Sequence, residues 1–371
     1  MMKRVFLYAL LAVSTAAAAP AREPARQPLP GKIARPTANE PKASSFSMRQ
    51  AALFLDATTV QWVRERKCGS CHSSYPYLLA RPTLREFSSS APSEIRGFFE
   101  RRVAHWDDGK PDSKPKYDAE VISTAEALAV NDALSTGALH PLSRRALDRV
   151  WTLQKADGGF KWIKCGWAPL EYDDYYGAVV AALGAGYAPG DYAKATSARA
   201  GLDRLRGYFR ENPPPSLHHQ TMLLWASTRL EGVMTSEQKE QTVKSLRALQ
   251  KGDGGWCLPS LGHWKRRDGT PNDPQSPSDG YATGLVVFVL RQAGVPAADP
   301  AIERGVSWLK TNQRVSGRWF TRSLNDDVDH YIADAGTSFA VLAIRSCENT
   351  GKPGNRSAAI SSVQHSRRFA R

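Results

Sequence analysis

The residues with the clearest chemical meaning in this chain are Cys68-Gly69-Ser70-Cys71-His72, a C-x-x-C-H pentad. Two thiols at this spacing reach the two vinyl groups of one porphyrin, and the adjoining imidazole lies beneath the iron as an axial ligand. A short-loop disulfide, a reactive dithiol or half of a zinc site uses the same residue types. The pentad therefore predicts haem c, attached through Cys68 and Cys71 with His72 on the iron.

A sixth iron ligand is less clearly marked. His105 lies in the segment 101–116, which we expect to be irregular and able to fold back over the iron. An open or water-bound position is the alternative. After removal of a leader, the only thioether candidates are Met48, Met222 and Met234. Elsewhere, Cys165 and Cys257 form a disulfide if their Cα atoms come within about 7 Å.

The beginning of the chain is typical of an exported protein. Residues 1–19 carry a basic start at Lys3 and Arg4, an apolar run over 5–13 and a tail of small residues, as secretory signals do. The apolar run is too short to span a membrane, so we expect no transmembrane segment. This predicts a periplasmic or secreted protein, which is where haem c is attached.

The composition is that of a globular chain with a basic surface. The formal net charge is +14, so an acidic partner or peripheral contact with an anionic membrane is conceivable. The basic residues are scattered and export separates the chain from nucleic acid, so we expect no nucleic-acid partner. Residues 20–45 are rich in proline and predict a disordered linker, and 349–371 predict a disordered basic tail.

Between these ends the chain repeats itself. Leu153-Gln154-Lys155-Ala156-Asp157-Gly158-Gly159-Phe160 returns as Leu249-Gln250-Lys251-Gly252-Asp253-Gly254-Gly255-Trp256, and more weakly around Gln313, Gly317 and Trp319. An amphipathic pattern precedes each copy, and the glycines favour the left-handed conformation that ends a helix. A helix of small apolar residues follows each turn. A repeat of this length predicts stacked helical pairs.

Polar outer helices thus alternate with apolar inner ones. The outer helices are expected at 50–66, 142–154, 236–250 and 301–313, and the inner helices at 123–134, 173–184, 217–229, 279–292 and 332–345. The pentad follows the first outer helix, where later units carry Asp-Gly-Gly and an aromatic residue. We therefore predict one all-α domain over 46–348, with the pentad in a repeat turn rather than in a separate cytochrome domain.

These glutamine and glycine turns resemble the repeats of squalene-hopene cyclases and related prenyltransferase-type toroids. The resemblance covers residues 48–347 and implies an α/α toroid, a double ring of about six helical hairpins. Together with the upstream C-x-x-C-H, the chain also looks like exported bacterial members of this group. The Asp-x-Cys zinc spacing of prenyltransferases is missing from these units.

The resemblance also implies an acid. Glu171-Tyr172-Asp173-Asp174 is similar to the Asp-x-Asp-Asp motif with which cyclases protonate an alkene, although its first acid is Glu. Asp173 would donate the proton and Asp174 and Glu171 would support it. Aspartates at helix starts also act as caps, and this is the alternative for Asp173 and Asp279.

Three functions remain open at this stage. The first is electron transfer or haem-based sensing, with the toroid as a scaffold for a redox partner protein. The second is a terpenoid cyclase-like enzyme that uses Asp173. The third is a haem-free module that holds an apolar small molecule or a protein at the mouth of the ring.

Overall fold

Helices that are apolar on one face alternate along the chain with helices that are buried on all sides. The computed structural model describes residues 33–110 and 114–348, and within them it has twelve α-helices and no named strand. The outer helices are α1 (Met48–Arg66), α3 (Ala91–His105), α5 (Pro141–Thr152), α7 (Thr196–Glu211), α9 (Ser236–Ala248) and α11 (Pro300–Asn312). The inner helices are α2 (Ser74–Ala80), α4 (Asp118–Ser135), α6 (Asp174–Tyr187), α8 (Leu217–Ser227), α10 (Gly280–Gln292) and α12 (Ile332–Glu348).

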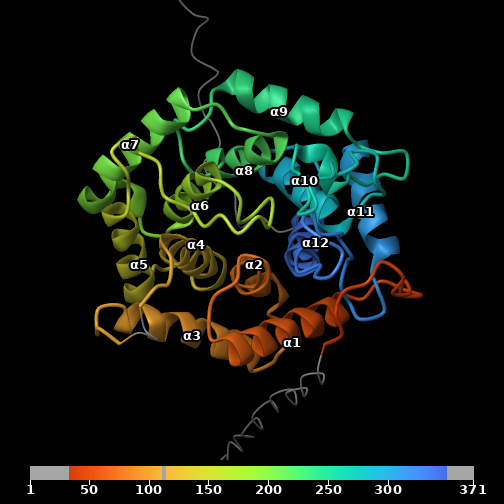
Figure 1. The fold of residues 1–371 in the computed structure, drawn as a ribbon, viewed down its shortest axis with the longest axis horizontal. Coiled ribbons are helices and arrows are strands. Elements are labelled where there is room, and N and C mark those ends of the chain that lie inside the picture. Colours follow the sequence, from red (N-terminus) through yellow and green to blue (C-terminus); the bar gives the residue numbers. More distant parts are fainter. Residues whose placement is uncertain (1–32, 111–113, 349–371) are drawn as a thin grey trace, which may run out of the picture.

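The outer helices surround the inner ones in a closed double ring (Figure 1). Each outer helix is followed by one inner helix, which gives six pairs, and the first and last inner helices, α2 and α12, lie in contact. The predicted all-α toroid is therefore confirmed. The sequence did not predict α2, α3 or α7, and the segment expected to be irregular from residue 101 begins inside α3.

The inner ring forms the core. Every residue from Gly280 to Leu290 of α10 is buried, as expected for a helix with neighbours on all sides. Small residues let these helices approach closely. A Cβ atom on Gly284 would lie 2.5 Å from the backbone nitrogen of Ala340 in α12, so a larger residue would push the two helices apart.

The repeated glutamines join neighbouring units. The side-chain Nε2 of Gln154 donates to the carbonyl of Gly158 in its own turn and to that of Gly201 in α7, the next outer helix. Gln250 does the same with Gly254 and with Ala301 at the start of α11. Gln313 bonds Gly317 and Ser47, which precedes α1, so the third copy joins the last unit to the first. We call these three contacts the glutamine clamps.

Because inner and outer helices alternate in direction, the ring has two different mouths. At the turn mouth the outer helices end and the inner helices begin, and it carries the pentad and the glycine turns. At the far mouth the inner helices end and the next outer helices begin. Asp173, Ser216 and Asp279 cap the starts of α6, α8 and α10 with their side chains, so all three belong to the turn mouth.

The segment before α1 differs from the linker that its prolines predict. Residues 33–47 lie against the ring: Glu40 pairs with Arg318, and the carbonyl of Pro41 accepts from the backbone of Val315. The prolines prevent this segment from forming a helix, but its backbone groups can still hydrogen-bond to the ring. The expected leader, residues 20–32 and the tail 349–371 lie outside the described residues. Within the described ranges no helix is long and apolar enough to cross a membrane.

Candidate functional site

The pentad leads from α1 into α2. Lys67 ends α1 in the left-handed conformation, with φ of 53°. The hydroxyl of Ser74 accepts from the backbone of Ser70 at 2.8 Å, which ties the loop to the start of α2. Gly69 is required here, because a Cβ atom would lie 2.1 Å from the Tyr75 hydroxyl oxygen. The residues between the two cysteines thus hold the pentad in one conformation.

His72 is buried beneath the turn mouth and faces a carboxylate. Its Nδ1 lies 3.4 Å from Oε1 of Glu171, and the two side chains are 7% and 17% exposed. Burial opposes ionisation of Glu171, but the hydrogen bond with His72 outweighs it and lowers the pKa of this carboxyl. Glu171, which the resemblance assigns to acid catalysis, lies against His72 in this structure, and its catalytic role stays a prediction.

Three aromatic side chains stand around the pentad, and we call them the aromatic rim. Trp62 comes from α1, Trp167 from the loop before α6, and Tyr331 from the loop before α12. The centroid of Tyr331 lies 5.6 Å from that of Trp62 and 5.8 Å from that of Trp167, and Trp167 meets the His72 ring edge-on at 6.1 Å. All three are half-buried, so the rim is partly open to solvent.

The two thiols of the pentad are free but lie in different surroundings. Cys68 is half-buried beside Trp62, and burial together with the Glu120 carboxylate raises the pKa of its thiol. Cys71 faces the interior beside Glu171, and burial raises the pKa of this thiol well above its usual value. Both are therefore protonated thiols near neutral pH.

The other two cysteines discussed above do not pair. Cys165 is exposed, whereas Cys257 is buried with its thiol donating to the carbonyl of Pro274 at 3.2 Å, and both are free. The expected Cys165–Cys257 disulfide is therefore not formed in this structure. The two segments follow different glycine turns, which the ring holds apart.

Cys71 also lines a small chamber at the centre of the ring. The chamber measures about 30 Å³ and is enclosed by aromatic and apolar side chains of the inner helices, among them Tyr176, Met222 and Trp225. Glu126 of α4 lines it as well, is 6% exposed and makes no hydrogen bond or ion pair with the described residues. Burial alone raises the pKa of Glu126 to about 8, so this carboxyl is uncharged at neutral pH.

Asp173 occupies a different kind of site. It accepts from the backbone of Tyr176 at 3.0 Å as the cap of α6, and its Oδ2 lies 3.0 Å from Nε2 of His219. Burial would raise the pKa of Asp173, but the His219 contact and the backbone N–H groups outweigh it and lower the pKa. Asp174 accepts from the backbone of Trp162 and pairs with Lys164. Asp173 is thus held as a structural anion, and the proton-donor role stays a prediction.

Asp279 is the equivalent cap of α10, but it is buried more deeply. It accepts from the backbone of Ala282 at 2.9 Å and from the hydroxyl of Thr321 at 3.1 Å. Burial raises the pKa of Asp279 to about 6 despite these bonds. The capping role that the sequence offers as an alternative is thus the one that both aspartates perform in the structure.

The remaining histidines do not form a shared ligand site. His105 ends α3, is 57% exposed and pairs with Asp108 at 2.6 Å, so its role as an iron ligand stays a prediction. His218 is buried with its Nε2 2.9 Å from the Tyr281 hydroxyl, at an interplanar angle of 88° to His219. In the described part of the chain, no group of three or more His, Cys, Asp or Glu side chains is arranged to hold a metal ion.

Three features of these sites carry no signal in the sequence. Glu126 has the same apolar neighbours along the chain as any inner-helix residue. The rim residues come from three segments that only the closed ring brings together. A large cavity, of about 800 Å³, lies at the far mouth, where no motif draws attention to it. All three features depend on residues that the fold brings together from separate parts of the chain.

The comparisons with known proteins give structural likeness only. No protein-family model matches the chain, and no curated protein sequence matches it. Solved structures with a similar arrangement include a possible member of the GH105 family from Klebsiella pneumoniae, with a TM-score of 0.47 and 12% identity, covering 73% of this chain and 81% of that one. The ent-copalyl diphosphate synthase from Streptomyces platensis has a TM-score of 0.49 and 12% identity, covering 74% and 50%. A polysaccharide lyase has a TM-score of 0.48 and 11% identity, covering 81% and 97%.

Proposed function

We propose that this protein carries a covalently attached c-type haem at its turn mouth and serves in electron transfer or haem-based sensing, with the helical ring as a scaffold. The observation that supports the proposal is the donor set: two free thiols at C-x-x-C spacing and an adjoining imidazole whose Nδ1 faces a carboxylate. These are the residue types that a haem c site needs.

The chain's own residues have distinct tasks in this proposal. Each thiol adds its S–H across one vinyl double bond, so attachment needs no oxidant. Glu171 accepts from Nδ1 of His72, which fixes the ring and leaves Nε2 available for a metal. The aromatic rim limits the access of water. When bound, haem iron supplies a one-electron redox couple.

The space around the pentad restricts where such a group can lie. The central chamber beyond Cys71 measures only about 30 Å³ and takes no porphyrin. A porphyrin would therefore lie on the partly exposed side of the pentad, beside Cys68 and the aromatic rim. An acidic or membrane-bound redox partner would approach the same mouth.

The test is the full chain produced in a bacterial periplasm that attaches haem c. We expect haem to remain with the protein after acid-acetone extraction, and a Cys68→Ala/Cys71→Ala variant to lose it. Cys165→Ala, which removes an exposed thiol elsewhere, is the matched control and should keep it. A His72→Ala variant should keep the thioethers and change the visible spectrum. Folded wild-type protein without retained haem would overturn the proposal.

The terpenoid-processing alternative gains a different acid from the structure. Protonating an alkene requires a carboxyl that carries its proton. Burial keeps the proton on Glu126, although the raised pKa also makes it a weaker acid, whereas the lowered pKa of Asp173 leaves that carboxyl ionised. If the ring acts on a polyprenoid substrate, product formation should depend on Glu126 and survive Asp173→Asn. Loss of product in Asp173→Asn with full activity in Glu126→Gln would restore the assignment made from the sequence.

A further inference from the structure

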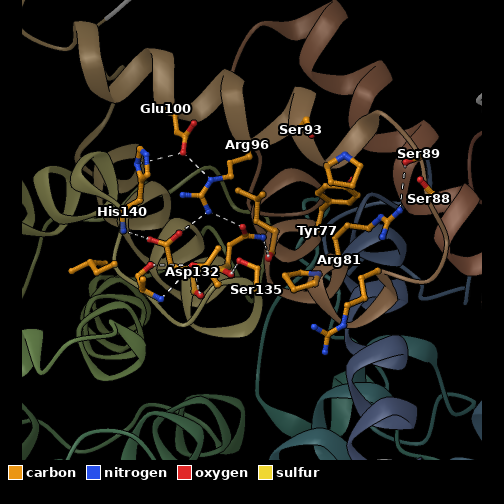
Figure 2. A pocket seen from close by; sticks show the side chains of 18 of the residues that line it. Tyr77, Arg81, Ser88, Ser89, Ser93, Arg96, Glu100, Asp132, Ser135 and His140 are labelled. Carbon is orange, nitrogen blue, oxygen red and sulfur yellow. Dashed lines mark hydrogen bonds and ion pairs between the residues drawn. The ribbon is translucent and has the colours of Figure 1, made fainter. Parts of the chain in front are cut away.

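A large cavity lies at the far mouth of the ring, and no residue of the pentad lines it (Figure 2). Its walls are the end of α2, the 3₁₀ turn η1 (Arg81–Leu84), the start of α3, the end of α4 and the start of α5. The volume of about 800 Å³ is within the range of small-molecule sites, about 300–1,000 Å³. The cavity therefore has the size to enclose an organic ligand.

Much of the cavity surface is apolar. The apolar lining comes from both sides and consists of Leu78, Pro82, Phe87, Pro92, Leu139 and Pro141. Three of these are prolines, whose fixed backbone makes the walls stiff. A ligand with a hydrocarbon body would displace water from this surface favourably.

Arg81 forms one wall but has no capacity left for a ligand. Its Nε lies 2.8 Å from Oδ1 of Asp56, and its NH1 donates to the carbonyl of Leu84 at 2.7 Å. Tyr77 donates to the same Asp56 oxygen at 2.7 Å. The ion pair of Arg81 and Asp56 is buried, and its two charges cancel. Arg81 thus shapes the cavity, and its charge is not offered to a ligand.

The arginine of the opposite wall is also engaged, and this wall carries one more negative than positive charge. Arg96 of α3 bonds Glu100 at 2.8 Å through Nε and Asp132 of α4 at 2.7 Å through NH1. Asp132 also accepts from the backbone of His140 at 2.8 Å. Figure 2 shows this network along one side, with Ser93 on the same face of α3 as Arg96. One arginine against two carboxylates leaves no excess positive charge on this wall.

Arg85 is different. It lines the cavity, is exposed, and makes no ion pair or hydrogen bond with any residue in the described ranges. The hydroxyls of Ser88 and Ser93 line the cavity and likewise have no protein partner there. The cavity thus presents one unmatched cation and two hydroxyl groups beside apolar walls.

We propose that this far-mouth cavity binds an amphipathic organic anion, with an apolar body against the proline-rich walls and a single carboxylate or sulfonate paired with Arg85. Glu100 and Asp132 both bond Arg96, so neither carboxylate is left without a partner for a cation. A polyphosphate would need more than one free cation. The site is separate from the pentad, so it stands whether or not haem is attached.

The probe for this site is 1-anilinonaphthalene-8-sulfonate, an apolar anion that fluoresces when it leaves water. We expect the full chain to bind it, and Arg85→Gln to raise its Kd about tenfold, as loss of a charge-assisted bond does. Arg199→Gln removes another exposed, unpaired arginine, on α7, and should leave the Kd unchanged. Dodecanoate should displace the dye at concentrations at which dodecanol does not.

Filling the cavity with a large side chain is an independent test of where the ligand binds. Ser93→Trp places an indole inside the cavity and should abolish binding, and Ala138→Trp on the opposite wall serves if the first variant fails to fold. Circular dichroism establishes that each variant is helical. Equal dye binding by wild type, Arg85→Gln and a folded tryptophan variant would overturn the proposal, as would the absence of dye and dodecanoate binding.

Discussion

Two acidic side chains on neighbouring inner helices are held in opposite charge states by their surroundings. Asp173, at the start of α6, receives backbone N–H groups and His219, and its pKa is lowered. Glu126, within α4, lines a mostly apolar chamber and makes no hydrogen bond or ion pair with the described residues, and burial raises its pKa to about 8. The same chemical group is a cap in one place and a neutral acid in the other. The difference lies entirely in the hydrogen-bond donors within reach.

The raised pKa of Glu126 predicts a pH dependence of stability. Its usual value is 4.5 and its value in the fold is about 8, so the folded state binds the proton more tightly. The contribution is complete below about pH 4.5 and is lost as pH rises through about 8. Glu126→Gln should remove this loss and make the protein more stable at pH 9 by about 4 kcal/mol.

Denaturant unfolding from pH 4 to 9 measures this effect. Glu240→Gln, on the exposed face of α9, is the matched control and should follow the wild-type curve. The prediction fails if Glu126→Gln is no more stable than wild type at pH 9. Other buried acids also make the free energy of unfolding of the wild type depend on pH, so the effect is measured as the difference between the variant and the wild type.

For individual residues, the sequence predicts motifs that are contiguous in the chain, but not groups that the fold assembles from distant segments. The pentad is a contiguous motif, so its three functional residues could be named directly. Glu171 could also be named, but for alkene chemistry, because its partner His72 lies almost a hundred residues earlier and only ring closure brings them together. Trp62, Trp167 and Tyr331 could not be grouped for the same reason. Whether haem is attached stays a prediction.

At the scale of elements, the repeated glutamine is a joint between units. Gln154, Gln250 and Gln313 each bond the glycine carbonyl of their own turn and a carbonyl at the next outer helix. The turn must bring its own carbonyl back to this side chain, which requires the left-handed glycine: Gly254 has φ of 90°, and a Cβ there would lie 2.8 Å from the carbonyl oxygen of Arg304. The motif thus encodes both the end of one helix and its attachment to another.

Replacing one clamp residue tests this account. Gln250→Ala removes two bonds of 2.8 Å and leaves the carbonyls of Gly254 and Ala301 without this donor. We expect a loss of about 2 kcal/mol in the free energy of unfolding, measured by denaturant titration. Gln241→Ala, in the helix α9 that precedes this turn, removes only an exposed contact of 3.4 Å and should change stability by less than about 0.5 kcal/mol. Equal effects would show that the clamp contributes nothing specific.

Some elements could be predicted and others could not. The inner helices α6, α10 and α12 are continuous apolar runs that follow a glycine turn, and the sequence predicts all three. Helix α2 has only seven residues, includes Pro76 and follows the pentad instead of a glycine turn, so no periodicity reveals it. Helix α7 is followed by Asn212-Pro213-Pro214-Pro215-Ser216, without the Asp-Gly-Gly turn that comes after α5 and α9.

At the scale of the whole molecule, the ring separates two chemical environments. The turn mouth holds the pentad, the aromatic rim and the capping aspartates, whereas the far mouth holds the large cavity with Arg85. The short helix α2 runs from one to the other, with Cys71 and His72 before its start and Tyr77 and Leu78 among the cavity walls. Repetition in the sequence was sufficient to predict the ring, because each unit buries its apolar helix only against neighbours.

The three clamps are chemically alike but differ in the length of chain they span. Gln250 and Ala301 are 51 residues apart, whereas Gln313 and Ser47 are 266 apart. The Gln313 clamp joins the two ends of the described ring, which can separate while the residues between them stay folded, so opening there disrupts less structure than opening at Gln250. The backbone bond from Arg314 to Arg318 should therefore show about tenfold less protection from hydrogen exchange than the matched bond from Lys251 to Gly255, although their lengths are 2.8 and 2.9 Å. Mass spectrometry of peptides over 313–318 and 250–255 compares the two, and equal protection would contradict the argument.

The ring consequently has a hinge-like seam where its last unit meets residues 41–47 and α1. Parting there breaks the Gln313 clamp and the backbone bonds to Pro41 and Ala43, and it also separates α12 from α1 and α2. Trp62 and Tyr331 come from the two sides of this seam, so its opening would separate the rim beside Cys68. Opening would also expose the apolar faces of α2 and α12 to water, so the burial of these faces holds the ring closed together with the clamp.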